Sequence, residues 1–149
     1  MSQPLLVCLF LSPLCSAQQN KLIVHPPDPA TLKRGATAVQ KLELSVLPGF
    51  HVNSDKPKDE FLIPLKLTWT AGPLEDQGVT YPKPEEIKVG NQMVTVYTGK
   101  FELETKFQVP ANAPKGNAVM TGKLRYQACN NEMCFRPSTA DVSLPVTIQ

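Results

Sequence analysis

The sequence has few of the groups on which the common enzyme classes depend. It contains two histidines, His25 and His51, and no Gly-x-Ser-x-Gly elbow, so a serine hydrolase is a poor hypothesis. It also lacks a glycine-rich phosphate loop and a dinucleotide fingerprint. The neighbouring carboxylates Glu85 and Glu86 lie in a charged, loop-like stretch, which favours solvated surface groups over a glycosidase pair. None of these activities is therefore expected.

Long apolar runs and clusters of basic residues are also missing. The formal net charge is +2, and no group of lysines and arginines is long enough to follow a phosphate backbone, so we expect no nucleic-acid partner. Beyond the N-terminal segment, no apolar run approaches the roughly 20 residues of a membrane span, so we expect a soluble product with no membrane span. The 15 prolines argue for many turns and few long helices.

The N-terminal segment is the one apolar stretch of note. Residues 4–15 are too short to cross a bilayer but fit the hydrophobic region of an export signal, and the small residues Ser16 and Ala17 follow. No lysine or arginine precedes the stretch, so only the α-amino group supplies the usual positive end. We predict a signal peptide over residues 1–17 and a mature domain over residues 18–149, which would be periplasmic or otherwise exported.

Cleavage at that point would change the cysteine count. Cys8 and Cys15 would be removed, leaving a single pair, Cys129 and Cys134, in an exported compartment. Residues 130–132 between them are polar and suit a turn, because asparagine tolerates left-handed backbone and can bond its own main chain. A bond across so short a turn would stabilise the fold by only about 2 kcal/mol. A crosslink that adds so little to the stability of the fold favours a redox role for the pair. The alternative is a static structural disulfide in a secreted domain.

Alternation of apolar and polar residues predicts strands along the mature chain. Helical periodicity is hard to find there, and turn residues separate the segments. These features predict an all-β domain, an antiparallel β-sandwich of the immunoglobulin-like type, with Trp69 as a core anchor. The expected strands cover residues 21–25, 39–47, 50–53, 61–70, 92–97, 101–109, 120–126 and 142–148, and residues 71–86 are expected to form a loop with a short edge strand at 79–81.

The cysteine pair favours thiol–disulfide exchange. In this chemistry a thiolate attacks a partner's disulfide, a mixed disulfide forms, and a second nearby thiol resolves it. The mechanism needs two cysteines close together, at least one of them accessible, on a rigid support. Cys129 and Cys134, at a turn that protrudes from a sandwich, would meet these requirements. The rival hypothesis is a non-catalytic secreted binding module with a structural disulfide, in which Trp69, Tyr81 or Tyr97 contributes to a protein or ligand surface.

A soft metal site is a third hypothesis for the same region. Copper or zinc could be held by Cys129, Cys134, His51 and Met133. The four residues between the cysteines fit poorly to the tight Cys-x2-Cys knuckle, and only one other strong ligand is available. We therefore expect no metal and no other cofactor.

The cysteine motif also resembles a known family. The runs Tyr126-Gln127-Ala128-Cys129 and Cys134-Phe135-Arg136-Pro137, on a β-rich exported domain, resemble the N-terminal periplasmic domain of the thiol:disulfide interchange protein DsbD. Upstream, residues 42–53 look like the strand-turn-strand ahead of that family's active site, and residues 97–100 look like the end of its cap loop. The resemblance covers roughly residues 20–149.

The resemblance implies an immunoglobulin-like domain that carries electrons, in effect a protein-disulfide reductase. It would accept them from a DsbD-type membrane electron transporter through a thioredoxin-like domain, and pass them to periplasmic disulfide isomerases or cytochrome c maturation factors. By position, Cys134 would form the mixed disulfides with thioredoxin-like partners and Cys129 would resolve them. The sequence ends at Gln149, before any membrane region or thioredoxin-like domain, so we expect either a stand-alone relative or part of a longer protein.

The resemblance also assigns the surroundings of the pair. Tyr97 or its neighbours from Met93 on, including Val96, would belong to a cap loop that shields the cysteines between partners. At positions 51 and 53 this chain departs from well-known members, which have tyrosines there. The other residues expected beside the cysteines are His51, Asn53, Tyr126 and Phe135.

Overall fold

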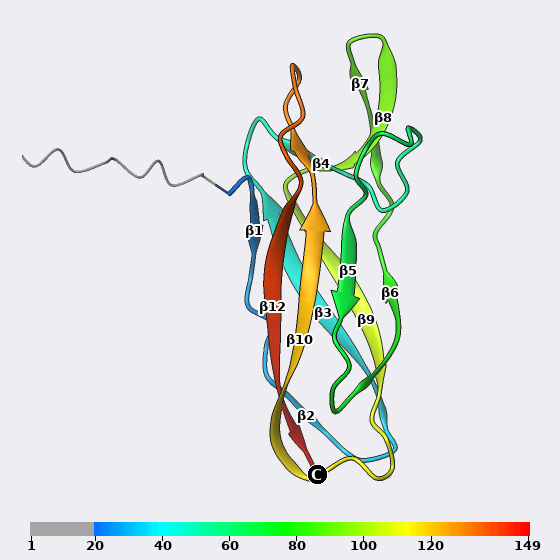
Figure 1. Cartoon of the computed structure of the whole chain (residues 1–149), viewed down its shortest axis with the longest axis vertical. Helices are drawn as coiled ribbons and strands as arrows, with labels where there is room; N and C mark the ends of the chain where they lie inside the picture. The colour runs from blue at the N-terminus through cyan, green and yellow to red at the C-terminus, as the bar shows by residue number, and fades with distance from the viewer. Residues whose placement is uncertain (1–19) are drawn as a thin grey trace, which may run out of the picture.

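The computed structural model describes residues 20–149, which form an elongated molecule of strands and turns (Figure 1). The predicted signal peptide lies outside these residues. The strands are β1 (Leu22–Val24), β2 (Ala30–Leu32), β3 (Thr37–Val46), β4 (His51–Asn53), β5 (Lys66–Trp69), β6 (Glu75–Thr80), β7 (Glu85–Val89), β8 (Gln92–Tyr97), β9 (Lys100–Gln108), β10 (Gly116–Tyr126), β11 (Ala128–Cys129) and β12 (Ser138–Ile148).

Two larger sheets form a sandwich, and a third sheet lies at one end of it (Figure 1). The strand orders are β1-β3-β9-β6 and β2-β12-β10-β5 in the sandwich, and β11-β4-β8-β7 in the end sheet. Neighbouring strands are antiparallel, except that β2 runs parallel to β12. The predicted all-β, immunoglobulin-like sandwich is therefore confirmed, with one parallel pair added to it.

Alternate side chains of the long strands meet between the two larger sheets. On β10, Met120, Leu124 and Tyr126 are buried, whereas Lys123 and Arg125 are exposed. The same alternation runs along β3, β9 and β12, as the sequence pattern predicted. Burying one large apolar side chain contributes about 1.5–3 kcal/mol relative to leaving it exposed. This apolar layer is what holds the two sheets together.

Trp69 on β5 anchors the core, as predicted. Its side chain is nearly buried, and the indole Nε1 donates a hydrogen bond to the Thr105 hydroxyl at 3.0 Å. The indole also meets the Phe107 ring edge-on, with 5.2 Å between ring centroids. Both the apolar body and the polar edge of the tryptophan are thus satisfied inside the sandwich.

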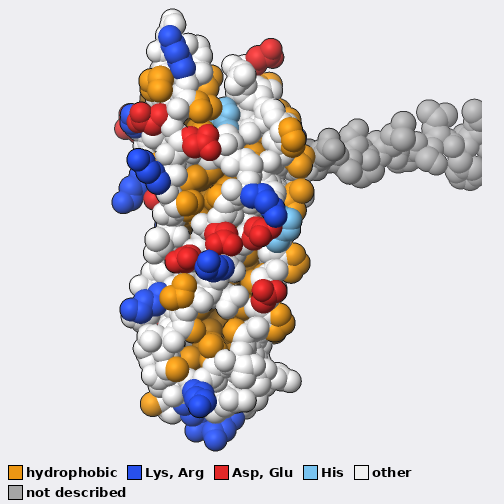
Figure 2. Space-filling model, turned by 180° about the vertical axis from the view of Figure 1, so that it is seen from behind, with side chains coloured by type: hydrophobic (Ala, Val, Ile, Leu, Met, Phe, Trp, Pro, Cys, Tyr) orange, Lys and Arg blue, Asp and Glu red, His pale blue; other side chains and the backbone are white. Residues whose placement is uncertain are grey.

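The outer face of β3 and β9 carries charges of both signs (Figure 2). Lys41 Nζ lies 3.2 Å from a carboxylate oxygen of Glu102, and Lys100 Nζ lies 3.0 Å from one of Glu43. The hydrogen bond and the positive charge of Lys100 lower the pKa of Glu43. All four side chains remain solvated, so these pairs add little to stability compared with the layer beneath them.

The prediction differs from the structure most in three segments. Residues 71–86, expected to form a loop with a short edge strand at 79–81, contain β6 and the start of β7. The edge strand is confirmed at residues 79–80, but it begins at Glu75; its first half was missed because β6 is exposed, with only Val79 partly buried, and shows no apolar alternation. The sequence pattern also missed β2, whose three residues follow a proline-rich stretch and pair with the distant β12. The strand expected from residue 61 begins only at Lys66, after Pro64, which cannot donate to a ladder.

Gly122 provides a test of how tightly the sandwich is packed. It lies opposite Trp69 in the β10–β5 pair, and a Cβ added to it would lie 2.9 Å from an indole carbon and 3.2 Å from the Thr68 carbonyl oxygen. We expect Gly122→Ala to lower the free energy of unfolding by about 1–3 kcal/mol, because the indole has to shift. Urea denaturation measures this. Thr121→Ala, on the exposed face, should change it by less than about 0.5 kcal/mol; equal effects would contradict the packing argument.

Candidate functional site

Cys129 and Cys134 form a disulfide at the end of the molecule that carries the third sheet. Their sulfurs are 2.02 Å apart and their Cα atoms 4.0 Å apart. Cys129 belongs to β11, which pairs with β4 so that Ala128 lies opposite Val52 and Cys129 opposite His51. The register between two short strands thus decides which side chains surround the buried sulfur.

The turn between the cysteines is held by its own hydrogen bonds. The Asn130 Oδ1 atom accepts from the backbone N–H groups of Glu132 and Met133, each at 2.8 Å. The Asn130 N–H donates to the Met133 carbonyl at 2.9 Å, and the Phe135 N–H donates to the Ala128 carbonyl at 2.9 Å. The predicted polar turn, with an asparagine bonding its own main chain, is confirmed. These hydrogen bonds hold the turn without involving the sulfur of either cysteine.

The two cysteines differ sharply in exposure. Cys129 is only 1% exposed, whereas Cys134 is solvent-exposed. Met133, next to the exposed cysteine, is 55% exposed although it is apolar. Cys134 is therefore the more accessible of the two cysteines to an incoming sulfur atom.

One pocket, of about 190 Å³, lies against the disulfide on the side of the β7–β8 hairpin. The hairpin and the cysteine turn project from the same end of the molecule (Figure 1). His51 in this pocket is 6% exposed, and burial lowers the pKa of its imidazole, which is therefore neutral at pH 7. The pocket is lined by His51, Asn53, Leu62, Val89, Gln92, Val94, Cys129, Asn130, Glu132, Met133 and Cys134.

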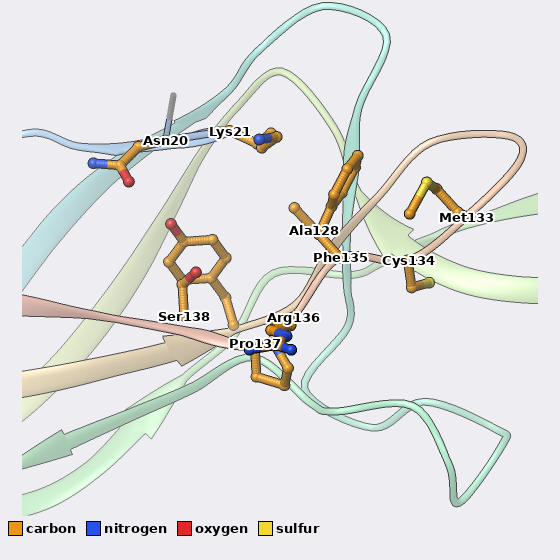
Figure 3. A pocket seen from close by; sticks show the side chains of 10 residues that line it. Asn20, Lys21, Ala128, Met133, Cys134, Phe135, Arg136, Pro137 and Ser138 are labelled. Carbon is orange, nitrogen blue, oxygen red and sulfur yellow. The ribbon is translucent and has the colours of Figure 1, made fainter. Parts of the chain in front are cut away.

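A second pocket, of about 490 Å³, lies on another side of Cys134 (Figure 3). Phe135 stands in it, with its ring centroid 5.9 Å from that of Phe50 and with Lys21 Nζ 4.7 Å from the centroid. Tyr126 also lines this pocket. Cys134 and Met133 line both pockets, so the exposed sulfur lies between two recesses.

The sequence, over residues 20–145, matches the family described as the N-terminal part of the thiol:disulfide interchange protein DsbD. The chain belongs to this family. The resemblance found in the cysteine motif is thereby confirmed. Membership supports a thiol–disulfide exchange domain, and the bonded cysteine pair is the group in the DsbD-type domain that could carry out the exchange.

Solved structures with similar folds include the N-terminal periplasmic domain of ScsB from Proteus mirabilis, with a TM-score of 0.59 and 18% identity. That likeness covers 77% of this chain but only 43% of the ScsB chain. The DsbD N-terminal domain of Neisseria meningitidis in its reduced form has a TM-score of 0.48 and 17% identity, covering 76% of this chain and 82% of that one. At such identities the ScsB likeness shows the fold alone. Comparison with curated proteins gives no match.

Gln127 is a site residue of this DsbD-type domain that the sequence analysis did not single out. Its Oε1 atom accepts hydrogen bonds from Asn53 Nδ2 and from the Ile63 backbone N–H, both at 3.0 Å. Its Nε2 atom donates to the Phe135 carbonyl at 3.2 Å. Asn53 Nδ2 also donates to the Ile63 carbonyl at 3.1 Å. One amide side chain therefore fastens β4, the segment before β5 and the strand that leaves the cysteine turn.

The predicted cap residues Val96 and Tyr97 lie at the base of the β7–β8 hairpin. Val96 pairs with Asn53 in the end sheet, and both Val96 and Tyr97 are buried. The Tyr97 hydroxyl donates to Asp55 Oδ1 at 2.7 Å, and burial, together with this carboxylate, raises the pKa of Tyr97 far above its usual range. Neither residue lines the pocket beside the disulfide, where Val94 of the same hairpin does. The role of Tyr97 in a cap stays a prediction.

The described residues contain neither a metal-binding cluster nor a membrane-crossing helix. Within residues 20–149, no group of three or more histidine, cysteine, aspartate or glutamate side chains is placed to hold a metal ion. The same range contains no helix that is long and apolar enough to cross a membrane.

Removal of the Gln127 side chain tests the network at the site. Gln127→Ala leaves the Ile63 N–H without its acceptor and removes one of the two acceptors of Asn53 Nδ2, so we expect the free energy of unfolding to fall by about 1–3 kcal/mol. Urea denaturation of the oxidised protein measures the change. Arg125→Ala, at an exposed position on the adjoining strand, is the control and should change it by less than about 0.5 kcal/mol. Equal values for the two variants would contradict the network.

The buried imidazole predicts acid sensitivity. The pKa of His51 in the folded protein lies below its ordinary value of 6.5, so the unfolded chain binds a proton more readily. Stability from this group is complete above about pH 6.5 and is lost as the pH falls through the folded-state pKa. Thermal unfolding between pH 7 and pH 5 should show the decline in the wild type and a weaker one in His51→Gln. If His25→Gln, at a half-exposed position, flattens the profile equally, this explanation is wrong.

Proposed function

We propose that the domain passes reducing equivalents between a thioredoxin-like donor and exported disulfide partners through Cys129 and Cys134. The observation that carries the proposal is the unequal exposure of a bonded pair: Cys134 is exposed, whereas Cys129, to which it is bonded, is almost fully buried. Membership in the DsbD family supports the same chemistry. The proposed acceptors are periplasmic disulfide isomerases or cytochrome c maturation factors, and the proposed source of electrons is a DsbD-type membrane transporter.

The exchange assigns a different role to each cysteine. In the reduced domain, the Cys134 thiolate attacks a partner's disulfide, whose S–S bond breaks, and one partner sulfur leaves with an electron pair. Cys129 then attacks the Cys134 sulfur, so that the mixed disulfide breaks and the second partner sulfur is released as a thiolate. The domain ends as a disulfide, and the partner gains two electrons. Reversal of this sequence with a reduced thioredoxin-like protein restores the dithiol.

The surroundings of Cys134 suit contact with another protein. Met133 beside it is exposed, and the two recesses that flank the sulfur offer space for a partner's side chains. We propose that the β7–β8 hairpin, with Val96 and Tyr97 at its base, shields the pair between encounters. The same proposal includes export, with residues 1–17 removed and residues 18–149 acting in the periplasm or an equivalent compartment.

The binding-module alternative has less support from the geometry. The aromatic residues suggested for its surface are engaged within the domain: Trp69 bonds Thr105, and the Tyr81 hydroxyl accepts the Leu67 backbone N–H at 2.9 Å. A structural disulfide would have a lower reduction potential than an exchangeable one, and a redox titration measures this difference.

A redox titration distinguishes an exchangeable pair from a structural one. We expect the Cys129–Cys134 bond to have a reduction potential above about −300 mV, within the range in which thioredoxin-like proteins exchange with it. Equilibration with glutathione or dithiothreitol buffers, followed by thiol alkylation and mass determination, measures the potential. A value well below about −300 mV would identify the bond as a structural staple.

Cysteine variants test the assignment of roles. Reduced Cys129→Ser, incubated with an oxidised thioredoxin-like protein, should accumulate a mixed disulfide through Cys134, because the resolving sulfur is gone. Non-reducing electrophoresis detects the adduct. Cys134→Ser is the matched control and should form little adduct, since Cys129 is buried. Trapping by Cys134→Ser alone would reverse the roles, and trapping by neither, while the wild type exchanges, would exclude the electron-carrier function.

A further inference from the structure

His51 is a buried imidazole without a hydrogen-bond partner beside the resolving cysteine. The β4–β11 register places it directly opposite Cys129, and such cross-strand neighbours have Cβ atoms about 4.5–5.5 Å apart on the same face of a sheet. Its side chain lines the pocket against the disulfide. Within residues 20–149, no hydrogen bond or ion pair to its ring nitrogens is present. The imidazole is thus a buried ionisable group on the strand that pairs with Cys129.

His51 lines the same pocket as both cysteines. Among the described residues, every fully buried side-chain nitrogen or oxygen has a hydrogen-bond partner. The ring nitrogens of His51 have none, so they are not fully enclosed, and the space that this residue lines is the pocket shared with Cys129 and Cys134. Asn53, the polar neighbour on the same strand, is instead saturated by Gln127 and Ile63.

We propose that His51 accepts the proton of the Cys129 thiol when that cysteine resolves the mixed disulfide, an inference that rests on the proposed exchange function. The proton moves from the Cys129 sulfur to a ring nitrogen of His51, giving imidazolium and a thiolate. The thiolate bonds to the Cys134 sulfur as the bond between Cys134 and the partner breaks. The electron pair leaves on the partner's sulfur, which then takes a proton from the imidazolium or from water.

The environment of Cys129 explains why it needs a proton acceptor. Burial disfavours a charged thiolate, and Cys129 is almost fully buried. The pocket beside it has no lysine or arginine in its wall to stabilise the negative charge. Apart from the cysteines and His51 itself, Glu132 on the turn is the one ionisable residue among the described residues that line this pocket. The hairpin contributes Val89, Gln92 and Val94. A neutral imidazole can accept the proton, and the lowered pKa of His51 keeps it neutral at pH 7.

The two steps can be separated in one experiment with the full chain. The reduced protein is mixed in a stopped-flow instrument with a symmetrical aryl disulfide whose released thiolate absorbs visible light. The first release reports attack by Cys134, and its rate depends on the concentration of the disulfide. The second release reports resolution by Cys129 and is independent of that concentration. Both phases are followed from pH 6 to pH 10 for the wild type, His51→Gln, His51→Asn and Glu132→Gln.

We expect both His51 variants to slow the second phase at pH 7 by on the order of tenfold, because an unassisted thiol is only a few per cent ionised there. The deficit should shrink as the pH rises toward about 10, because a growing share of the thiol then ionises without help. The first phase should stay within about twofold of the wild type. Glu132→Gln, which removes only a neighbouring charge, should change the second phase far less than the His51 variants do. A merely structural role for His51 would not produce a deficit that shrinks with rising pH, so the pH profile distinguishes the two.

The outcomes separate this inference from the function on which it rests. If the wild type releases only one equivalent of aryl thiolate, Cys129 does not resolve the adduct, and the exchange function itself fails. If the wild type shows both phases and His51→Gln keeps the wild-type second phase at pH 7, the proton-transfer role alone is overturned. The same holds if Glu132→Gln slows that phase as much as the His51 variants do.

Discussion

A three-residue strand, β4, joins the cysteine turn to the rest of the molecule. It pairs with β11 on one side and with β8 on the other, so it links the disulfide to the β7–β8 hairpin. Its central residue, Val52, is fully buried in the core, and the alternation of a strand then turns His51 and Asn53 to the opposite face. A one-residue slip in this register would bury the wrong side chains and replace His51 beside Cys129. The chemistry at the end of the molecule depends on that short pairing.

Hydrogen bonds hold the cysteine turn in addition to the sulfur–sulfur bond. The Asn130 side chain closes the turn, and the Phe135 N–H bonds the Ala128 carbonyl across it. Gln127 fixes the base of the same turn to its neighbours. None of these contacts involves a cysteine sulfur, so we expect the two thiols to stay near each other on reduction. The pair would then open and close with little rearrangement of the chain.

The sequence was most informative where packing produces a pattern. Residues of β3, β9, β10 and β12 alternate between core and solvent, so their strands and the sandwich were predictable. β6 was hard to predict because it is an exposed edge strand that pairs with β9 through backbone hydrogen bonds. Such bonds do not require an alternation of polar and apolar side chains. The cysteine motif pointed to the site itself. Gln127 lies between β10 and β11 and looks like an ordinary polar residue, and its partners Asn53 and Ile63 are far away in sequence, so the local pattern did not indicate its role.

The parallel pairing of β2 with β12 sets the order in which the domain can be completed. Thr31 lies beside Thr147, so one of the first strands needs one of the last residues as its neighbour. Synthesis from the N-terminus therefore cannot complete this sheet before residues 146–148 have been made. Contacts between such distant segments also slow folding, typically to milliseconds or seconds. The edge of β12 that receives β2 is thus among the last parts of the sandwich that can form.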